Sequence, residues 1–124
     1  MNKALVISAH PDDDILGCGG IMSKLKNEIE FKVIFIGEGS TCRYPNPDTT
    51  EAEKEIDNRN AYAKKALEFI GVKEFSFYNL PCGRFDQVPL IEINKIIENI
   101  VISLSVLLEK KLDLFSSKVN ENKK

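Results

Sequence analysis

The sequence predicts an α/β fold in which helices cover a mostly parallel sheet in a three-layer α/β/α arrangement. Short apolar runs of strand length alternate along the chain with longer segments whose apolar residues recur at helical spacing. This β-α-β-α-β-α order favours a parallel sheet, because parallel strands need a crossover connection that is usually a helix. The 124 residues are enough for one compact domain, and 43% hydrophobic residues is ordinary for a globular protein.

The first strand is predicted at residues 5–7, a short apolar run typical of a buried parallel strand. Pro11 prevents further strand pairing soon after it. The glycine cluster at residues 17–20 permits a close approach of the backbone. The apolar spacing of Ile21, Met22 and Leu25 then predicts one buried helical face.

A second strand is predicted at residues 31–36, followed by a loop rich in Pro, Asn, Asp and Thr. The next helix should cover about 51–69, with Thr49 or Thr50 as its N-cap. Glu53 follows Thr50 by three residues, which fits a capping box, and Gly71 should end the helix.

The alternating segment 74–78 predicts a third strand, and a last helix should begin at Leu90. We expect one domain over residues 1–108 and a polar, disordered tail over 109–124. The segment 100–108 is apolar nearly all round, so its exposure would allow self-association. It is too short and too interrupted to predict a membrane span.

Composition excludes several classes of partner. The net charge of −2 gives no electrostatic reason to expect nucleic acid, and no aromatic residues alternate with basic ones. The N-terminal residues do not form a secretory signal, and three widely spaced cysteines suggest reduced thiols. These features predict a cytoplasmic protein.

The segment AHPDDDILGCGG, residues 9–20, contains the only histidine of the chain. It follows the first predicted strand, and ligands in open α/β sheets bind at the carboxyl ends of strands. Imidazole and carboxylate groups are good zinc ligands, and a neighbouring carboxylate can take a proton from zinc-bound water. His10 with one aspartate would give two ligands, and a second aspartate a general base.

Two other interpretations of this segment stay open. Aspartates after a strand also stabilise turns and helix N-termini, without any catalytic role. Gly17, Gly19 and Gly20 could instead indicate a nucleotide-binding loop. They do not form the G-x-G-x-x-G pattern, however, and the acidic residues 12–14 would repel phosphates.

The segment AHPDDDILGCGG closely resembles the signature of the PIG-L/LmbE-like family of zinc-dependent de-N-acetylases. RNAYAKKALEFIGV, beginning near Arg59, and FYNLPCGRFDQVPLIEINKIIENI resemble later parts of the same family, so the similarity extends over roughly residues 3–102. The resemblance implies a Rossmann-like fold. It also implies hydrolysis of an amide in an N-acetylated amino-sugar conjugate, commonly of N-acetylglucosamine, which releases acetate.

The resemblance implies a role for each matching residue. His10 and Asp13 would bind Zn²⁺, and Asp12 would be the general base. Arg59 would bind substrate or order the pocket, although a solvated ion pair is an equally good interpretation. Asp14 occupies a position where the family usually has glutamate.

The family's third zinc ligand is a downstream histidine, and this sequence has no second histidine. The segment after about residue 103 resembles nothing in the family, so we expect a chain that is truncated relative to its relatives. Cys42, Cys82 and Asp86 are the candidate substitutes, because thiolate and carboxylate also bind zinc. The sequence thus predicts a de-N-acetylase with an impaired zinc site or, alternatively, an inactive remnant or interaction module.

Overall fold

The computed structural model describes residues 2–121, and their side chains as far as residue 108. The chain divides into two compact units between residues 89 and 90. The first unit is an α/β sandwich, and the second is a helix, α3 (Leu90–Glu121). The elements of the first unit are β1 (Asn2–Ser8), α1 (Asp13–Leu25), β2 (Ile29–Gly37), η1 (Thr41–Arg43), α2 (Thr50–Ile70), β3 (Glu74–Leu80) and η2 (Phe85–Gln87).

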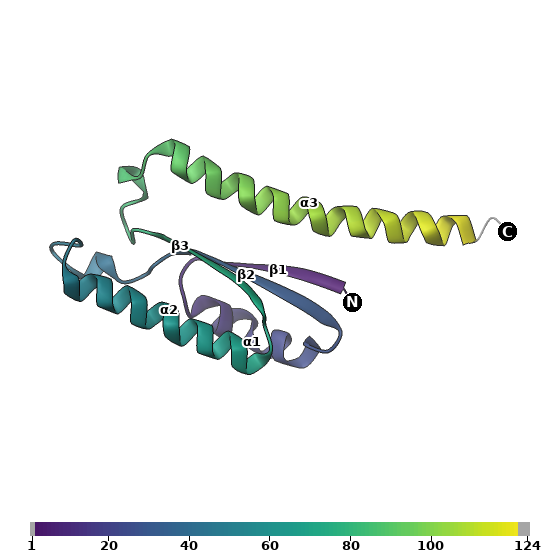
Figure 1. Cartoon of the computed structure of the whole chain (residues 1–124), viewed down its shortest axis with the longest axis horizontal. Helices are drawn as coiled ribbons and strands as arrows, with labels where there is room; N and C mark the ends of the chain where they lie inside the picture. The colour runs from purple at the N-terminus through teal and green to yellow at the C-terminus, as the bar shows by residue number, and fades with distance from the viewer. Residues whose placement is uncertain (1, 122–124) are drawn as a thin grey trace. The chain divides into compact units, whose positions relative to one another are not determined.

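The three strands form a parallel sheet in the order β1-β2-β3, which confirms the predicted α/β class. Each of the two crossover connections leads to the next strand on the same side, from β1 to β2 and from β2 to β3. Because such crossovers are almost always right-handed, they leave α1 and α2 on the same face, as Figure 1 shows. All three strands therefore end at one edge, and the loops that follow them are brought together there.

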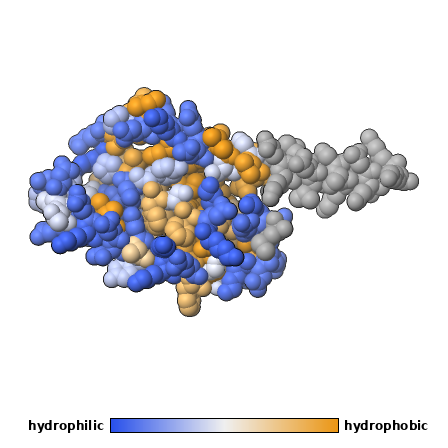
Figure 2. All heavy atoms as spheres, viewed as in Figure 1, coloured by the Kyte–Doolittle hydropathy of each residue, from blue (hydrophilic) through white to orange (hydrophobic). Residues whose placement is uncertain are grey.

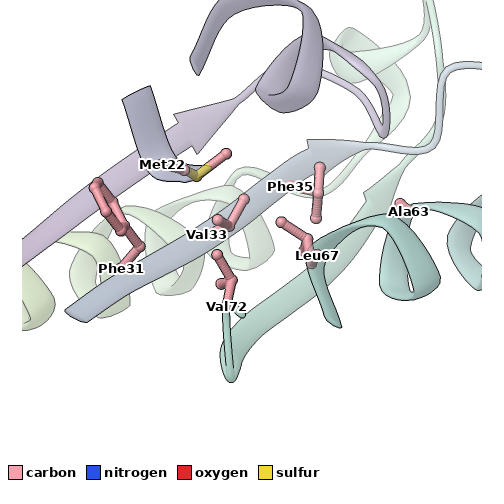
Figure 3. Close-up of a cluster of buried hydrophobic side chains, with 7 residues drawn as sticks. All are labelled: Met22, Phe31, Val33, Phe35, Ala63, Leu67 and Val72. Atoms are coloured by element: carbon pink, nitrogen blue, oxygen red, sulfur yellow. The ribbon is translucent and has the colours of Figure 1, made fainter. Parts of the chain in front are cut away.

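The core lies between this face of the sheet and the two helices (Figure 3). Phe35 of β2 is fully buried and stacks on Phe77 of β3, with ring centroids 4.7 Å apart. Met22 of α1 and Leu67 of α2 are also fully buried in this cluster. Burial of side chains of this size contributes about 1.5–3 kcal/mol each and holds the two helices against the sheet.

The N-terminus of α2 corrects one prediction. The Thr49 hydroxyl accepts a hydrogen bond from the Ala52 amide at 3.2 Å, so Thr49 is the N-cap. Thr50 is already helical, so the capping box between Thr50 and Glu53 does not form. At the other end, Gly71 adopts a left-handed conformation with φ 88°, which confirms the predicted stop.

The start of the first helix also differs from the prediction, which places the apolar helical face after the glycine cluster. Gly17, Gly19 and Gly20 lie inside α1, which begins at Asp13, rather than in a turn before a helix. The first turn of α1 carries Asp13 and Asp14, and their negative charges favour a helix N-terminus. The acidic residues therefore favour a helix that begins before the glycines rather than after them. Because residues 17–20 are helical, they do not form a phosphate-binding glycine loop.

The domain boundary predicted at residue 108 remains a prediction. The structure places its division at residue 89 and continues α3 to Glu121, while residues 122–124 lie outside the described part. In Figure 2, hydrophobic residues reach the surface along the coloured part of α3, between hydrophilic ones. Among the described residues, no helix is long and apolar enough to cross a membrane.

Candidate functional site

The loops at the carboxyl edge of the sheet bring together three segments that are distant in sequence. His10 follows β1, Glu38 follows β2 and Cys82 follows β3. Backbone hydrogen bonds join these loops, from the Gly37 amide to the Ala9 carbonyl at 2.8 Å and from the Glu38 amide to the Leu80 carbonyl at 3.1 Å. The expectation that the histidine lies at this edge is confirmed.

Asp12 occupies a strained position at the start of α1. Its φ of 138° is one that a non-glycine residue rarely adopts. Although Asp12 is the N-cap of α1, its side chain makes no capping hydrogen bond. The helix-capping interpretation therefore fails for this aspartate. A strained residue whose side chain does not cap its helix is a candidate for function.

Arg59 of α2 fixes the position of Asp12. Its Nη2 donates to the Asp12 carboxylate at 2.9 Å, and its Nε donates to the Pro11 carbonyl at 3.1 Å. Its Nη1 donates to the Gly39 carbonyl at 3.0 Å. One guanidinium thus connects α2 to the loops after β1 and β2. The ion pair with Asp12 was one of the predicted interpretations, but the Arg59 side chain is only 20% exposed, so this ion pair is not a solvated one. Of the two predicted pocket roles, these contacts favour ordering the pocket, because each guanidinium nitrogen already has a partner within the protein.

His10 and Asp13 lie next to each other. The His10 Nδ1 atom is 3.5 Å from Asp13 Oδ2, and the same oxygen accepts a hydrogen bond from the His10 amide at 3.0 Å. Asp13 therefore also stabilises the turn, as the alternative interpretation expected. Both side chains are partly exposed, at 35% and 48%, so a ligand can reach them.

Two glycines after β2 leave room for the His10 ring. A Cβ atom on Gly37 would lie 3.1 Å from His10 Cδ2. A Cβ atom on Gly39 would lie 3.0 Å from His10 Cβ and 3.2 Å from Arg59 Cζ, and Gly39 has a φ of 73°. A side chain at position 39 would therefore displace both the histidine and the arginine.

Asp14 is buried, unlike its two neighbours. Only 1% of it is exposed, and its Oδ2 atom has no hydrogen-bond partner. Burial raises the pKa of this carboxyl group, and hydrogen bonds from the backbone of Ile15 and Asp12 only partly oppose the effect. The shorter side chain at this position thus lies against the protein interior rather than with His10 and Asp13.

Glu38 is a site residue that the sequence analysis missed. It is 1% exposed, and its carboxylate accepts hydrogen bonds from the amides of Ser40, Thr41 and Cys82, the last at 2.7 Å. Burial raises its pKa, but these hydrogen bonds outweigh burial and leave the pKa lowered. A glutamate between two glycines, at Gly37–Gly39, was the available signal for a buried anion in a tight loop.

The candidate substitutes for a third zinc ligand differ in position. Cys82 Sγ is 4.0 Å from His10 Nε2 and 3.1 Å from Cys42 Sγ, whereas Asp86 is exposed in η2. The hydrogen bond with Cys42, together with burial, raises the pKa of the Cys82 thiol. Within residues 2–108, no three histidine, cysteine or acidic side chains are grouped to hold a metal ion. The described residues thus fit zinc only in part, as the pair His10 and Asp13.

A cavity of ≈ 660 Å³ lies between α1 and α2, beside this edge. Its polar lining comes from Asp12, Asp14, Glu55, Asn58 and Arg59, and its apolar lining includes Leu16, Tyr62 and Ala66. His10 and Asp13 do not line it. The general-base candidate therefore faces a space of ligand size, and the candidate metal ligands lie outside it.

The fold and the site together define a class, an α/β protein whose histidine and carboxylates meet at the carboxyl edge of a parallel sheet. Within it, the chain belongs to the PIG-L family: the family model, described as GlcNAc-PI de-N-acetylase, matches residues 5–109. This match confirms the resemblance seen in the sequence.

Two solved structures resemble the chain. An N,N'-diacetylchitobiose deacetylase from Pyrococcus horikoshii is 26% identical with a TM-score of 0.53, over 64% of this chain and 30% of that one. GalB, the 4-carboxy-2-hydroxymuconate hydratase of Pseudomonas putida KT2440, is 28% identical with a TM-score of 0.51, over 64% and 34%. The chain thus spans about a third of the length of these relatives.

One curated relative differs in its name. A protein of Pelagibacter ubique (strain HTCC1062) called peptidyl-tRNA hydrolase is 53% identical, over 43% of this chain and 36% of its own length. This similarity covers just over a third of that protein. The family model covers more of the present chain, so it decides the assignment.

Proposed function

We propose that this chain carries part of the catalytic site of a zinc-dependent amide hydrolase that removes acetate from an N-acetylated amino-sugar conjugate. The observation that carries the proposal is Asp12, whose backbone is strained, whose side chain makes no capping hydrogen bond, and whose carboxylate is held by Arg59 beside a cavity. Membership of the PIG-L family and the likeness to a deacetylase support the substrate class.

In this proposal each residue of the edge has a distinct task. The Asp12 carboxylate accepts a proton from the attacking water, and that proton goes to the departing amine. Arg59 holds the Asp12 carboxylate in place through this ion pair. His10 and Asp13 are proposed as two zinc ligands, and the third is not among the described residues. We therefore expect weak zinc binding and impaired activity.

Zinc affinity measured by competition with a coloured chelator tests the ligand pair. We expect weak binding by the full chain and at least a tenfold further loss in Asp13→Ala, since each ligand contributes strongly to such sites. Asp57→Ala is the matched control, because Asp57 is an exposed carboxylate of α2. Equal affinities for all three proteins would contradict the ligand assignment.

Acetate release from N,N'-diacetylchitobiose tests the reaction. A low rate that falls about 10²-fold or more in Asp12→Asn would support Asp12 as general base. If acetate release is absent, and stays absent when zinc is saturating, the result would favour a second candidate function over the hydrolase. That candidate is an inactive remnant or interaction module, and the lack of a third ligand within residues 2–108 favours it.

A further inference from the structure

Two cysteines from different loops meet at the carboxyl edge of the sheet. Cys42 lies in η1, after β2, and Cys82 follows β3. Their sulfur atoms are 3.1 Å apart, although both are free thiols. A disulfide bond is about 2.05 Å long, so the sulfurs need to approach by only about 1 Å.

The buried carboxylate of Glu38 holds both loops in this arrangement. It accepts hydrogen bonds from Thr41, the neighbour of Cys42, and from the amide of Cys82 itself. A second link joins the same loops, from Arg84 Nη2 to the Tyr44 carbonyl at 3.4 Å. The two thiols are therefore neighbours because the fold places them together, not because of a chance surface contact.

The end of β3 adds to this placement. Phe35 pairs with Phe77, but Gly37 pairs with Leu80, so β3 has one extra residue at this point. Asn79 takes up this irregularity with a φ of 52°. Such a bulge changes the direction of the strand end and aims the residues that follow it. Here it directs the chain that carries Cys82 toward η1.

We propose that Cys42 and Cys82 form a reversible disulfide bond beside His10. The oxidant is a low-molecular-weight disulfide such as glutathione disulfide. The exposed Cys42 thiolate attacks one of its sulfur atoms, forms a mixed disulfide and expels one thiol. Cys82 then attacks the sulfur of Cys42 and expels the second thiol. The protein loses two electrons and two protons, and the oxidant becomes two thiols.

Oxidation changes what His10 contacts. In the reduced protein the Cys82 sulfur lies 4.0 Å from His10 Nε2. The disulfide removes the thiol hydrogen and moves this sulfur toward Cys42. The same bond joins the loops after β2 and β3, so the edge becomes stiffer. The inference concerns thiol chemistry and stands whether or not the chain has hydrolase activity.

Equilibration of the full chain in glutathione redox buffers tests the proposal. We expect the number of free thiols to fall from three to one, with no change in molecular mass beyond the loss of two hydrogens. Peptide mapping should identify Cys42 linked to Cys82. Cys18, which lies against the core, should remain a thiol, so Cys18→Ser should oxidise like the wild type. Cys42→Ser and Cys82→Ser should form no internal disulfide.

The ring signals of the single histidine give a second readout by NMR at fixed pH. We expect them to shift when the wild type is oxidised and to stay unchanged in Cys42→Ser under the same buffer. Three free thiols throughout, a disulfide that includes Cys18, or disulfide-linked dimers in place of the internal bond would each overturn the proposal. An unchanged histidine signal in the oxidised wild type would overturn the link to His10.

Discussion

Single residues at the carboxyl edge carry out tasks that their types alone do not reveal. Asp12, Asp13 and Asp14 are consecutive and chemically identical, yet the structure gives each a different environment. Asp12 pairs with Arg59, Asp13 lies beside His10, and Asp14 is buried. The backbone turn into α1 separates them, because successive residues at a helix start point in different directions.

Glu38 should make stability depend on pH. Its pKa is lowered in the folded state, so the ionised group contributes stability above its unfolded pKa of 4.5. This contribution is lost as pH falls below about 4.5 and through the folded pKa. At pH 7, Glu38→Gln should lower the free energy of unfolding by about 1.5–3 kcal/mol, since an amide nitrogen would face backbone donors.

Urea unfolding of wild type and Glu38→Gln between pH 3 and 7 measures this effect. The difference between the two proteins should shrink toward low pH. Asp14 has a raised pKa and therefore the opposite pH dependence, but it is present in both proteins and cancels in the difference. A difference that does not vary with pH would contradict the role given to the Glu38 carboxylate.

Arg59 should matter far more than an ordinary surface arginine. Arg59→Met removes three hydrogen bonds to two loops and should lower the free energy of unfolding by about 1–3 kcal/mol. Arg59→Lys should not restore the lost stability, because a single ammonium group cannot reproduce the hydrogen bonds of the planar guanidinium group. Arg43→Met is the control in the same urea titration. The exposed ion pair of Arg43 with Glu55 should contribute less than about 1 kcal/mol. Equal losses of stability in Arg59→Met and Arg43→Met would show that Arg59 is not a positioning residue.

At the scale of elements, caps and crossovers decide where side chains arrive. The two ends of α2 are fixed by Thr49 and Gly71. Arg59 lies between them, on the side of the helix that faces the loops after β1 and β2. If the sequence slipped by one position along the helix, Arg59 would rotate by about 100° away from Asp12. The cap therefore contributes to the site as well as to the helix.

Thr49→Ala should lower the free energy of unfolding by about 1 kcal/mol, because the Ala52 amide loses its acceptor. Thr50→Ala should change it by much less, since Thr50 is not the cap and alanine favours a helix. Thermal unfolding monitored by circular dichroism distinguishes the two variants. A larger loss in Thr50→Ala would indicate that the capping box predicted from the sequence forms in solution.

For the whole molecule, α3 exposes several apolar side chains. Val101, Ile102, Val106 and Leu108 are 52%, 61%, 47% and 60% exposed. A helix with apolar residues on several sides needs a partner surface. The proposal of self-association through residues 100–108 follows from this exposure.

Sedimentation at increasing concentration tests self-association. The average mass of the wild type should rise above that of one chain. The double variant Ile102→Lys and Val106→Lys should remain a monomer over the same range, because two charges on one face oppose association. Glu98→Lys, a charge change at an exposed polar position, should behave like the wild type. A monomeric wild type at all concentrations would refute the proposal.

The sequence by itself determined the α/β class, the approximate positions of β1, β2, β3 and α2, the start of α3, and the family. These features depend on the local spacing of apolar residues and on the short segment at residues 9–20. Both signals are formed by residues that are close together in the sequence. It also identified His10, Asp12, Asp13 and Arg59 as candidates and the edge at which the histidine lies, although their roles stay proposals. It misjudged the glycines of α1 and the capping box, because competing local signals have similar strength there.

Only the tertiary structure decided which residues touch. Nothing in the sequence separates Asp14 from Asp13 in burial, joins Arg59 to Gly39 or makes Glu38 the buried acceptor for two loops. The closeness of Cys42 and Cys82 likewise depends on strand order and on the bulge at the end of β3. These contacts join residues far apart in the chain, and only the packing of sheet and helices fixes which of them meet.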